Sequence, residues 1–166
     1  MQIELKRIQF SERMSDETNC FVADLYINGK KVGEAKNDGC GGSTDYNGYS
    51  RENNDIIREC EEYCKSLPDV DLGDFKIKNS LENVIDELLE NFLKLKEEKK
   101  REKLMEKAII FGVPNGMSYQ YVHWRNRTLA QIPFLQLQKA VNDIREKHCK
   151  NGVVILNTNL AKLGVI

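Results

Sequence analysis

The sequence lacks the segments that would carry it into or across a membrane. No apolar run approaches the ~18 residues of a membrane-spanning helix, and the N-terminal MQIELKRIQF has no apolar signal segment. We therefore expect a cytoplasmic protein with no membrane partner. The chain has only two histidines, His123 and His148, and neither lies in a Ser–His–Asp or Cys–His signature. We expect no enzyme activity, no catalytic residue and no cofactor.

Cysteine is present, but without the spacings that indicate disulfides or metal. The five cysteines include no CxxC pair, and an odd number without an export signal is typical of reduced thiols. Cys60 and Cys64 lie i,i+4 on a predicted helix, and together with His148 and Cys149 they could form a zinc site if the helix ends met. Because Cys60 and Cys64 fall in an apolar stripe, where free cysteine behaves as a small hydrophobe, we expect no metal.

The sequence also lacks a large excess of positive or negative charge. The 166 residues are 40% hydrophobic and 31% charged, with a formal net charge of −1. This composition predicts a single soluble domain over residues 1–166. Any basic surface that attracts nucleic acid must then be local.

The most informative stretch is a hairpin at residues 20–37. Asn28-Gly29 stands between two strand-like runs, and this dipeptide is a strong signal for a two-residue hairpin turn. Such a turn pairs Leu25 with Val32 and places alternate residues on one face. That face holds Phe21, Ala23, Leu25 and Ile27.

The remaining elements follow from their periodicity. Residues 1–10 predict a strand that is bulged near Lys6-Arg7, and residues 108–123 predict a second hairpin. Helical spacing predicts helices over 51–65, with Ser50 as N-cap, over 80–95, and from Pro133 onward. Further signals are a capping box of Asn79 and Glu82, a short strand at Phe75 and Ile77, a helix end at Asn151-Gly152, and a docked apolar tail.

These elements predict an α+β fold. Its antiparallel sheet would contain the N-terminal strand, hairpin 20–37 and hairpin 108–123, with helices packed on one face. The helix from residue 80 continues as a basic half-helix around 94–107, which we expect to project from the domain. A homodimer through helix 80–107 is a further expectation.

The glycine-rich segment Asp38 to Tyr49 is the first candidate site. Consecutive backbone N–H groups in turns can bind an anion, and the following helix would point its positive N-terminus the same way. Neither a P-loop nor a dinucleotide-binding pattern is present, so glycines that only satisfy tight turns are the alternative. The candidate ligand-binding residues are Asp38, Gly39, Gly41, Gly42, Ser43, Thr44, Tyr46 and Arg51.

A second candidate surface combines aromatic and basic residues. Tyrosine, tryptophan and arginine are enriched in protein–protein hot spots and also in single-strand binders, although tyrosines on one strand face could equally cover a core. The half-helix lysines alternate with glutamates, which also fits a solvated helix. The candidate partner-binding residues are Tyr119, Tyr121, His123, Trp124, Arg125 and Arg127, with Lys99, Lys100, Arg101 and Lys103.

Three blocks of sequence carry a resemblance to a known family. The blocks TNCF and LYINGKKVG, followed by NDGCGG, are similar to those of a family of small uncharacterised proteins from bacteriophages and integrated mobile elements. The resemblance implies a bacterial host cell, where small single-domain proteins of this kind commonly bind and block host components. Because no catalytic constellation is present, we expect a non-catalytic protein that antagonises or modulates a host (defence) component through a protein interface. A binder of a nucleotide or another small anion at the glycine loop, and a nucleic-acid-binding accessory protein, are the alternatives.

Overall fold

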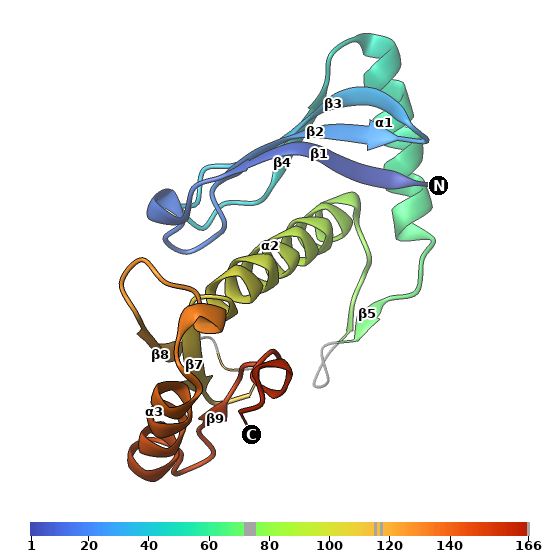
Figure 1. The fold of residues 1–166 in the computed structure, drawn as a ribbon. Helices are drawn as coiled ribbons and strands as arrows, with labels where there is room; N and C mark the ends of the chain where they lie inside the picture. Colours follow the sequence, from blue (N-terminus) through green and yellow to red (C-terminus); the bar gives the residue numbers. More distant parts are fainter. Residues whose placement is uncertain (72–75, 115, 117, 166) are drawn as a thin grey trace. The chain divides into compact units, whose positions relative to one another are not determined.

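The chain divides into two compact units, each with its own hydrophobic core. The structure is a computed structural model and describes residues 1–71, 76–114, 116 and 118–165. Instead of the one domain expected over 1–166, contacts group residues 1–94 and residues 95–166. Helix α2 (Leu81–Met105; Figure 1) contains the boundary, and none of its residues between Leu89 and Met105 is buried. Neither core therefore extends along the middle of this helix.

The fold class is α+β with antiparallel sheets, as predicted. The first sheet has four strands in the order β1-β2-β3-β4, and the second sheet has three in the order β8-β7-β9. The placement of hairpin 108–123 in the N-terminal sheet is wrong. Strand β7 (Ala108–Gly112) pairs with β8 (Tyr119–His123) on one side and with β9 (Val154–Ile155) on the other, so the hairpin belongs to a separate sheet within residues 95–166.

The predicted hairpin at residues 20–37 is confirmed, although its register differs. Strands β2 (Phe21–Ile27) and β3 (Lys30–Asn37) flank Asn28 and Gly29, whose φ angles are 49° and 79°. The register shifts between Leu25 and Tyr26, so that Leu25 pairs with Gly33, Tyr26 pairs with Lys31, and Val32 is the extra, buried residue. The predicted pairing of Leu25 with Val32 fails because of this bulge.

The N-terminal strand β1 (Ile3–Phe10) and its bulge are confirmed. Its register shifts between Lys6 and Gln9, and Arg7 has a φ of 52°. The bulge brings the Arg7 guanidinium to Asp24, which also accepts from Lys31 Nζ at 2.9 Å. Lys31 and Arg7 together lower the pKa of Asp24, so this exposed sheet face carries paired charges.

Helices α1 (Arg51–Lys65) and α2 cover the first sheet. Ser50 caps α1 as predicted, because its Oγ accepts the N–H of Asn53 at 3.2 Å. The predicted Asn79 cap is wrong: Ser80 Oγ accepts the N–H of Asn83 at 3.1 Å instead. Short strands β4 (Asp45–Gly48), β5 (Val70–Asp71) and β6 (Lys76–Ile77) complete residues 1–94. Ile77 thus lies in a strand, whereas Phe75 falls outside the described residues.

The buried residues of the first core come from strands β2 and β3 and from helices α1 and α2. This core includes Cys60 and Cys64, whose thiol pKa values burial raises, to about 12 for Cys60. From α2 it includes the buried Leu81, Ile85 and Leu89, while Leu88 is half-buried and lies outside it. The apolar stripe of α2 therefore belongs to the core. Its fully buried side chains are those of Leu81, Ile85 and Leu89, and Leu88 lies beside them.

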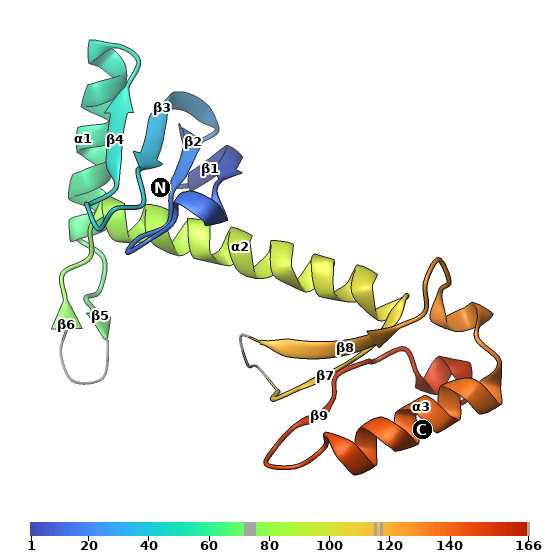
Figure 2. The same ribbon diagram turned by 90° about the vertical axis from the view of Figure 1, so that its left-hand side faces the viewer.

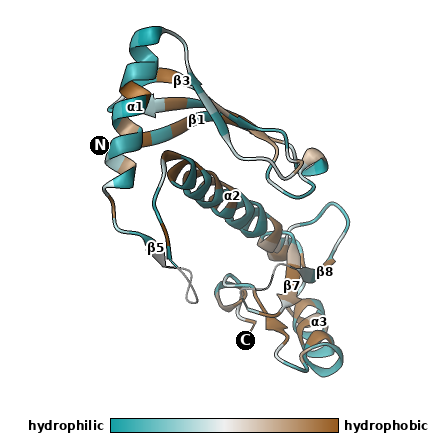
Figure 3. Cartoon of the chain, turned by 180° about the vertical axis from the view of Figure 1, so that it is seen from behind, coloured by the Kyte–Doolittle hydropathy of each residue, from teal (hydrophilic) through white to brown (hydrophobic). Residues whose placement is uncertain are grey.

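Residues 95–166 have a separate core beneath the second sheet. All of β7 is buried, which Figure 3 shows as a largely hydrophobic strand. Helix α3 (Phe134–Lys147) contributes Leu137, Val141 and Ile144. Its C-cap is His148, so Asn151-Gly152 does not end the helix but forms a later turn with positive φ at both residues.

The tail is docked as expected, since Leu160 and Val165 are buried. Short 3-10 helices occur at Glu12–Met14, Leu129–Gln131 and Ala161–Leu163. Within the described ranges, no helix is long and apolar enough to cross a membrane.

Candidate functional site

The glycine-rich loop is hydrogen-bonded to the loop that connects β1 to β2. The Gly39 carbonyl accepts the N–H groups of Asp16, Glu17 and Thr18 at 3.0, 3.1 and 3.3 Å. Gly39 has a φ of +87°, and an added Cβ there would lie 2.2 Å from the Met14 carbonyl oxygen. Glycine is required at this position both for the backbone angle and for the close approach.

The backbone donors that could form an anion nest are used inside the protein. Four N–H groups of the segment donate to side-chain oxygens of the same unit. They are Gly39 to Asn37 Oδ1 at 2.8 Å, Cys40 to Asp38 Oδ1 at 3.1 Å, Gly41 to Thr18 Oγ1 at 3.2 Å, and Thr44 to Glu82 Oε1 at 2.9 Å. An anion would have to displace these acceptors.

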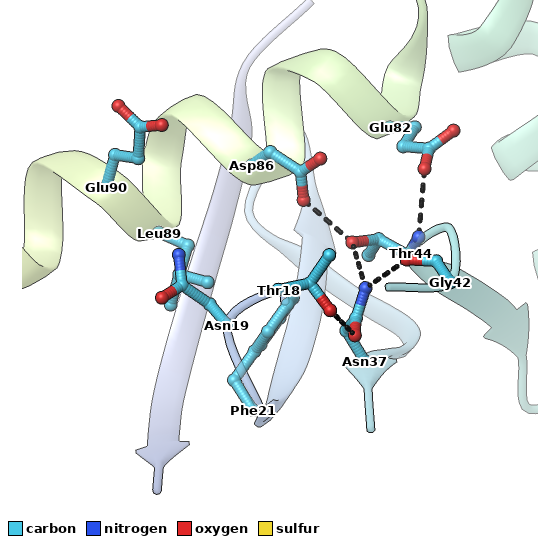
Figure 4. Close-up of a pocket in the computed structure, with 10 residues that line it drawn as sticks. All are labelled: Thr18, Asn19, Phe21, Asn37, Gly42, Thr44, Glu82, Asp86, Leu89 and Glu90. Atoms are coloured by element: carbon cyan, nitrogen blue, oxygen red, sulfur yellow. Dashed lines mark hydrogen bonds between the residues drawn. The ribbon is translucent and has the colours of Figure 1, made fainter. Parts of the chain in front are cut away.

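The cavity beside this loop is acidic. It has a volume of about 280 Å³, and Figure 4 shows Glu82, Asp86 and Glu90 of α2 along it. Thr44 Oγ1 donates to Asp86 Oδ1 at 2.7 Å, and burial raises the pKa of Asp86. Carboxylates at this position would repel an anion. The geometry therefore favours an internal role for the loop, in which Thr44 fastens it to α2.

Arg51 does not reach the glycine loop. Residues 45–48, which the sequence assigned to the loop, form strand β4, and β4 pairs with β3 from Lys36↔Asp45 to Gly33↔Gly48. The loop precedes one end of β4, and Arg51 begins α1 beyond the other end. Tyr46 points into the core and donates to Glu61 Oε1 at 2.9 Å. Gly42 and Ser43 stay in the loop and are exposed.

A groove in residues 95–166 brings the aromatic and basic residues together. Its volume is about 470 Å³, and none of its lining residues is a carboxylate. The lining residues are Leu104, Lys107, Tyr121, His123, Trp124, Asn126, Arg127, Thr128 and Gln131, called the basic groove below.

The aromatic side chains of the basic groove are held by the fold. Trp124 is half-buried and packs against the second core. Tyr121 is 50% exposed, and its ring centroid lies 5.7 Å from that of His123. Lys107 and Arg127 are exposed and supply the positive charge. The groove thus presents flat rings and cations from a rigid base.

The two units carry opposite charge, which the net charge of −1 conceals. Residues 95–166 contain 13 lysines and arginines against 6 aspartates and glutamates, a formal charge of +7. Residues 1–94 contain 12 against 20, a formal charge of −8. The basic groove therefore belongs to a unit that attracts anionic partners.

Other predicted partner residues lie elsewhere. Tyr119 lines a separate cavity of about 460 Å³ with Lys147, His148 and Lys150, and its hydroxyl lies 3.4 Å from Glu97 Oε1. Arg125 is exposed but lines neither cavity. The half-helix residues Lys99, Lys100, Arg101 and Lys103 also line neither, and a homodimer through this helix stays a prediction.

Metal ligands do not gather in the described part of the chain, where no group of three or more His, Cys, Asp or Glu side chains could hold an ion. Comparison of the chain with models of protein families, with curated proteins and with solved structures finds no match.

Proposed function

We propose that this protein works by binding, without catalysis, and that the basic groove holds an acidic surface of a partner protein. The observation that carries the proposal is the lining of the groove: Lys107 and Arg127 beside Tyr121, His123 and Trp124, with no carboxylate among them. Tryptophan, tyrosine and arginine supply most of the affinity at protein interfaces, and charge complementarity selects an acidic partner.

The resemblance to proteins of bacteriophages and mobile elements suggests the setting. In this proposal the partner is a protein of the bacterial host, such as a defence component, and binding modulates or blocks it in the cytoplasm. The near-rigid support of Trp124 by the second core favours a stable interface, because little side-chain entropy is lost on binding.

Arg127→Ala and Arg125→Ala form a matched test. Both residues are exposed arginines of one short segment, but only Arg127 lines the groove. A host protein cross-linked to the wild-type chain should be retained by Arg125→Ala and lost or weakened at least ~10-fold with Arg127→Ala, since an interface arginine is worth more than ~1.4 kcal/mol. Equal retention by both variants would contradict the proposal.

Single-stranded nucleic acid is a second candidate, favoured by the +7 charge of residues 95–166. Bases would stack on Tyr121 and Trp124 while cations contact phosphates. The logarithm of the binding constant for a labelled oligonucleotide should then fall steeply and linearly with the logarithm of the salt concentration. Nuclease treatment should release a nucleic-acid ligand and leave a bound partner protein in place. A retained complex that survives nuclease excludes this candidate.

A further inference from the structure

Strand β8 has a free edge that can accept another strand. It lies at the outside of the order β8-β7-β9, as Figure 2 shows, and pairs only with β7 among the described strands. Four of its five residues, all but Tyr119, are exposed.

The direction in which the N–H and C=O groups of β8 point can be derived from the hydrogen bonds that β7 makes on the side away from β8. Ile110 donates its N–H to Asn157 Oδ1 at 2.6 Å, and its carbonyl accepts from Leu156 N–H at 2.8 Å. Both groups of Ile110 therefore point away from β8. Backbone groups alternate in direction along an antiparallel strand, so Ile110↔Tyr121 is a non-hydrogen-bonded pair. The N–H and C=O groups of Tyr121 must point outward, to the free edge.

The same alternation applies two residues away in each direction. Tyr119 and His123 also present their backbone donors and acceptors at the edge, while Gln120 and Val122 bond to β7. Among the described residues, no partner accepts from or donates to the main chain of Tyr121 or His123. The edge offers a regular row of backbone groups, which is what an added strand requires.

This edge lacks the features by which proteins protect an exposed strand. Strand β8, with the sequence YQYVH, contains no Pro, Lys, Arg, Asp or Glu and no bulge. Strand β1 is also an edge strand, but it carries Glu4, Lys6 and Arg7 and is interrupted by a bulge. The contrast singles out β8 as an edge open to pairing.

We propose that the partner binds as an extended acidic peptide segment that adds a strand to β8. This inference rests on the proposed function and specifies its mode. The side chains of Tyr121 and His123 line the basic groove together with Lys107 and Arg127, so carboxylates on one face of the added strand meet these cations. Main-chain hydrogen bonds to Tyr121 and His123 supply affinity, and the groove selects acidic residues at alternate positions.

The test uses the full chain and a fluorescently labelled peptide of alternating glutamate and valine, with alternating lysine and valine as its control. Tyr121→Ala removes the side chain alone, whereas Tyr121→Pro also removes the outward N–H without touching a bond to β7. We expect the acidic peptide to bind in preference to the basic one, and Tyr121→Pro to weaken binding at least ~10-fold beyond Tyr121→Ala, because ~1.4 kcal/mol corresponds to tenfold.

Methylation of the peptide backbone tests the same point without any change to the protein. In an alternating peptide, the amides of the glutamates face one edge and those of the valines face the other. N-methylation of one set should abolish binding and N-methylation of the other should leave it within about threefold, a difference of roughly 0.6 kcal/mol. Equal effects of the two sets would overturn strand addition.

The outcomes separate this inference from the proposed function. If Arg127→Ala weakens peptide binding but Tyr121→Pro acts no more strongly than Tyr121→Ala, the groove binds acidic protein and strand addition is wrong. Binding of an oligonucleotide in place of the acidic peptide would overturn both. Pairing of β8 with a second copy of the chain, seen as concentration-dependent dimerisation that Tyr121→Pro abolishes, would overturn the acidic-peptide occupant.

Discussion

Replacement of Thr44 by valine should loosen the loop that Thr44 fastens to α2. Thr44 is 6% exposed, and its hydroxyl donates to Asp86 Oδ1 at 2.7 Å. Valine keeps the shape and removes the hydroxyl. A hydrogen bond to a charged group contributes about 1.5–3 kcal/mol, so Thr44→Val should lower the free energy of unfolding of residues 1–94 by about that amount at neutral pH.

The interaction itself can be isolated by a double-mutant cycle with Asp86→Asn. An amide still accepts a bond from Thr44, but a neutral bond contributes only about 0.5–1.5 kcal/mol, so Thr44→Val should cost about 1 kcal/mol less in the Asp86→Asn background. Ser43→Ala is the control, since Ser43 is exposed and adjacent, and its replacement should stay within about 0.5 kcal/mol.

The measurement must report on residues 1–94 alone. The single tryptophan, Trp124, belongs to the other unit, so unfolding is followed by hydrogen exchange resolved to the amides of β2 and to those from Gly39 to Thr44. A loss below about 0.5 kcal/mol for Thr44→Val, or no coupling to Asp86, would refute the fastening role of this bond.

Three further predictions concern helix α2 and the cysteines of residues 1–94. Ile85→Ala should cost about 2–5 kcal/mol because Ile85 is fully buried, whereas Leu95→Ala, at a 57% exposed position, should stay within about 0.5 kcal/mol; equal losses in denaturation would contradict the core assignment. The raised pKa of Asp86 means that its protonated form favours the folded state, so stability is lost as pH rises from about 3.8 through that raised pKa; Asp86→Asn should flatten this part of the stability–pH profile, and an unchanged profile would refute it. In the native protein Cys40, which is exposed, should react with a thiol reagent before Cys60, whose pKa burial raises to about 12; mass spectrometry of the labelled peptides gives the order.

The elements that the sequence predicted best are those with a local cause. Asn28-Gly29 fixes the hairpin because both residues adopt positive φ, and Ser50 caps α1 through a bond three residues away. Strands Ile3–Phe10 and Tyr119–His123 have periodicities that hold regardless of their neighbours.

The predictions from the sequence failed where contacts with distant parts of the chain determine the structure. The bulge at Val32 accompanies the approach of β4, whose Asn47 carbonyl oxygen would lie 2.1 Å from a Cβ added at Gly33. Strand β4, with the sequence DYNG, has little strand propensity. It forms because it can pair with the edge of β3 and because Tyr46 packs against the first core. Such pairing cannot be derived from periodicity.

The candidate site divides in the same way. Tyr121, His123, Trp124 and Arg127 were identified from their residue types and do share a groove. Lys107 was not predicted as a groove residue, because its position depends on the turn after α2, which the periodicity of the helix does not indicate. The opposite charges of the two units could have been found in the sequence by counting each half separately.

The charge separation has a practical consequence for the isolated protein. A chain of net charge −1 should pass ion exchangers near neutral pH with little retention, but a molecule with local charges of −8 and +7 should be retained on both cationic and anionic resins at low salt. Between molecules, the same separation favours electrostatic clustering at low ionic strength, which dissolves as the Debye length falls to about 8 Å at 0.15 M salt. Handling the protein near its isoelectric point therefore calls for added salt, because the small net charge supplies almost no repulsion between molecules.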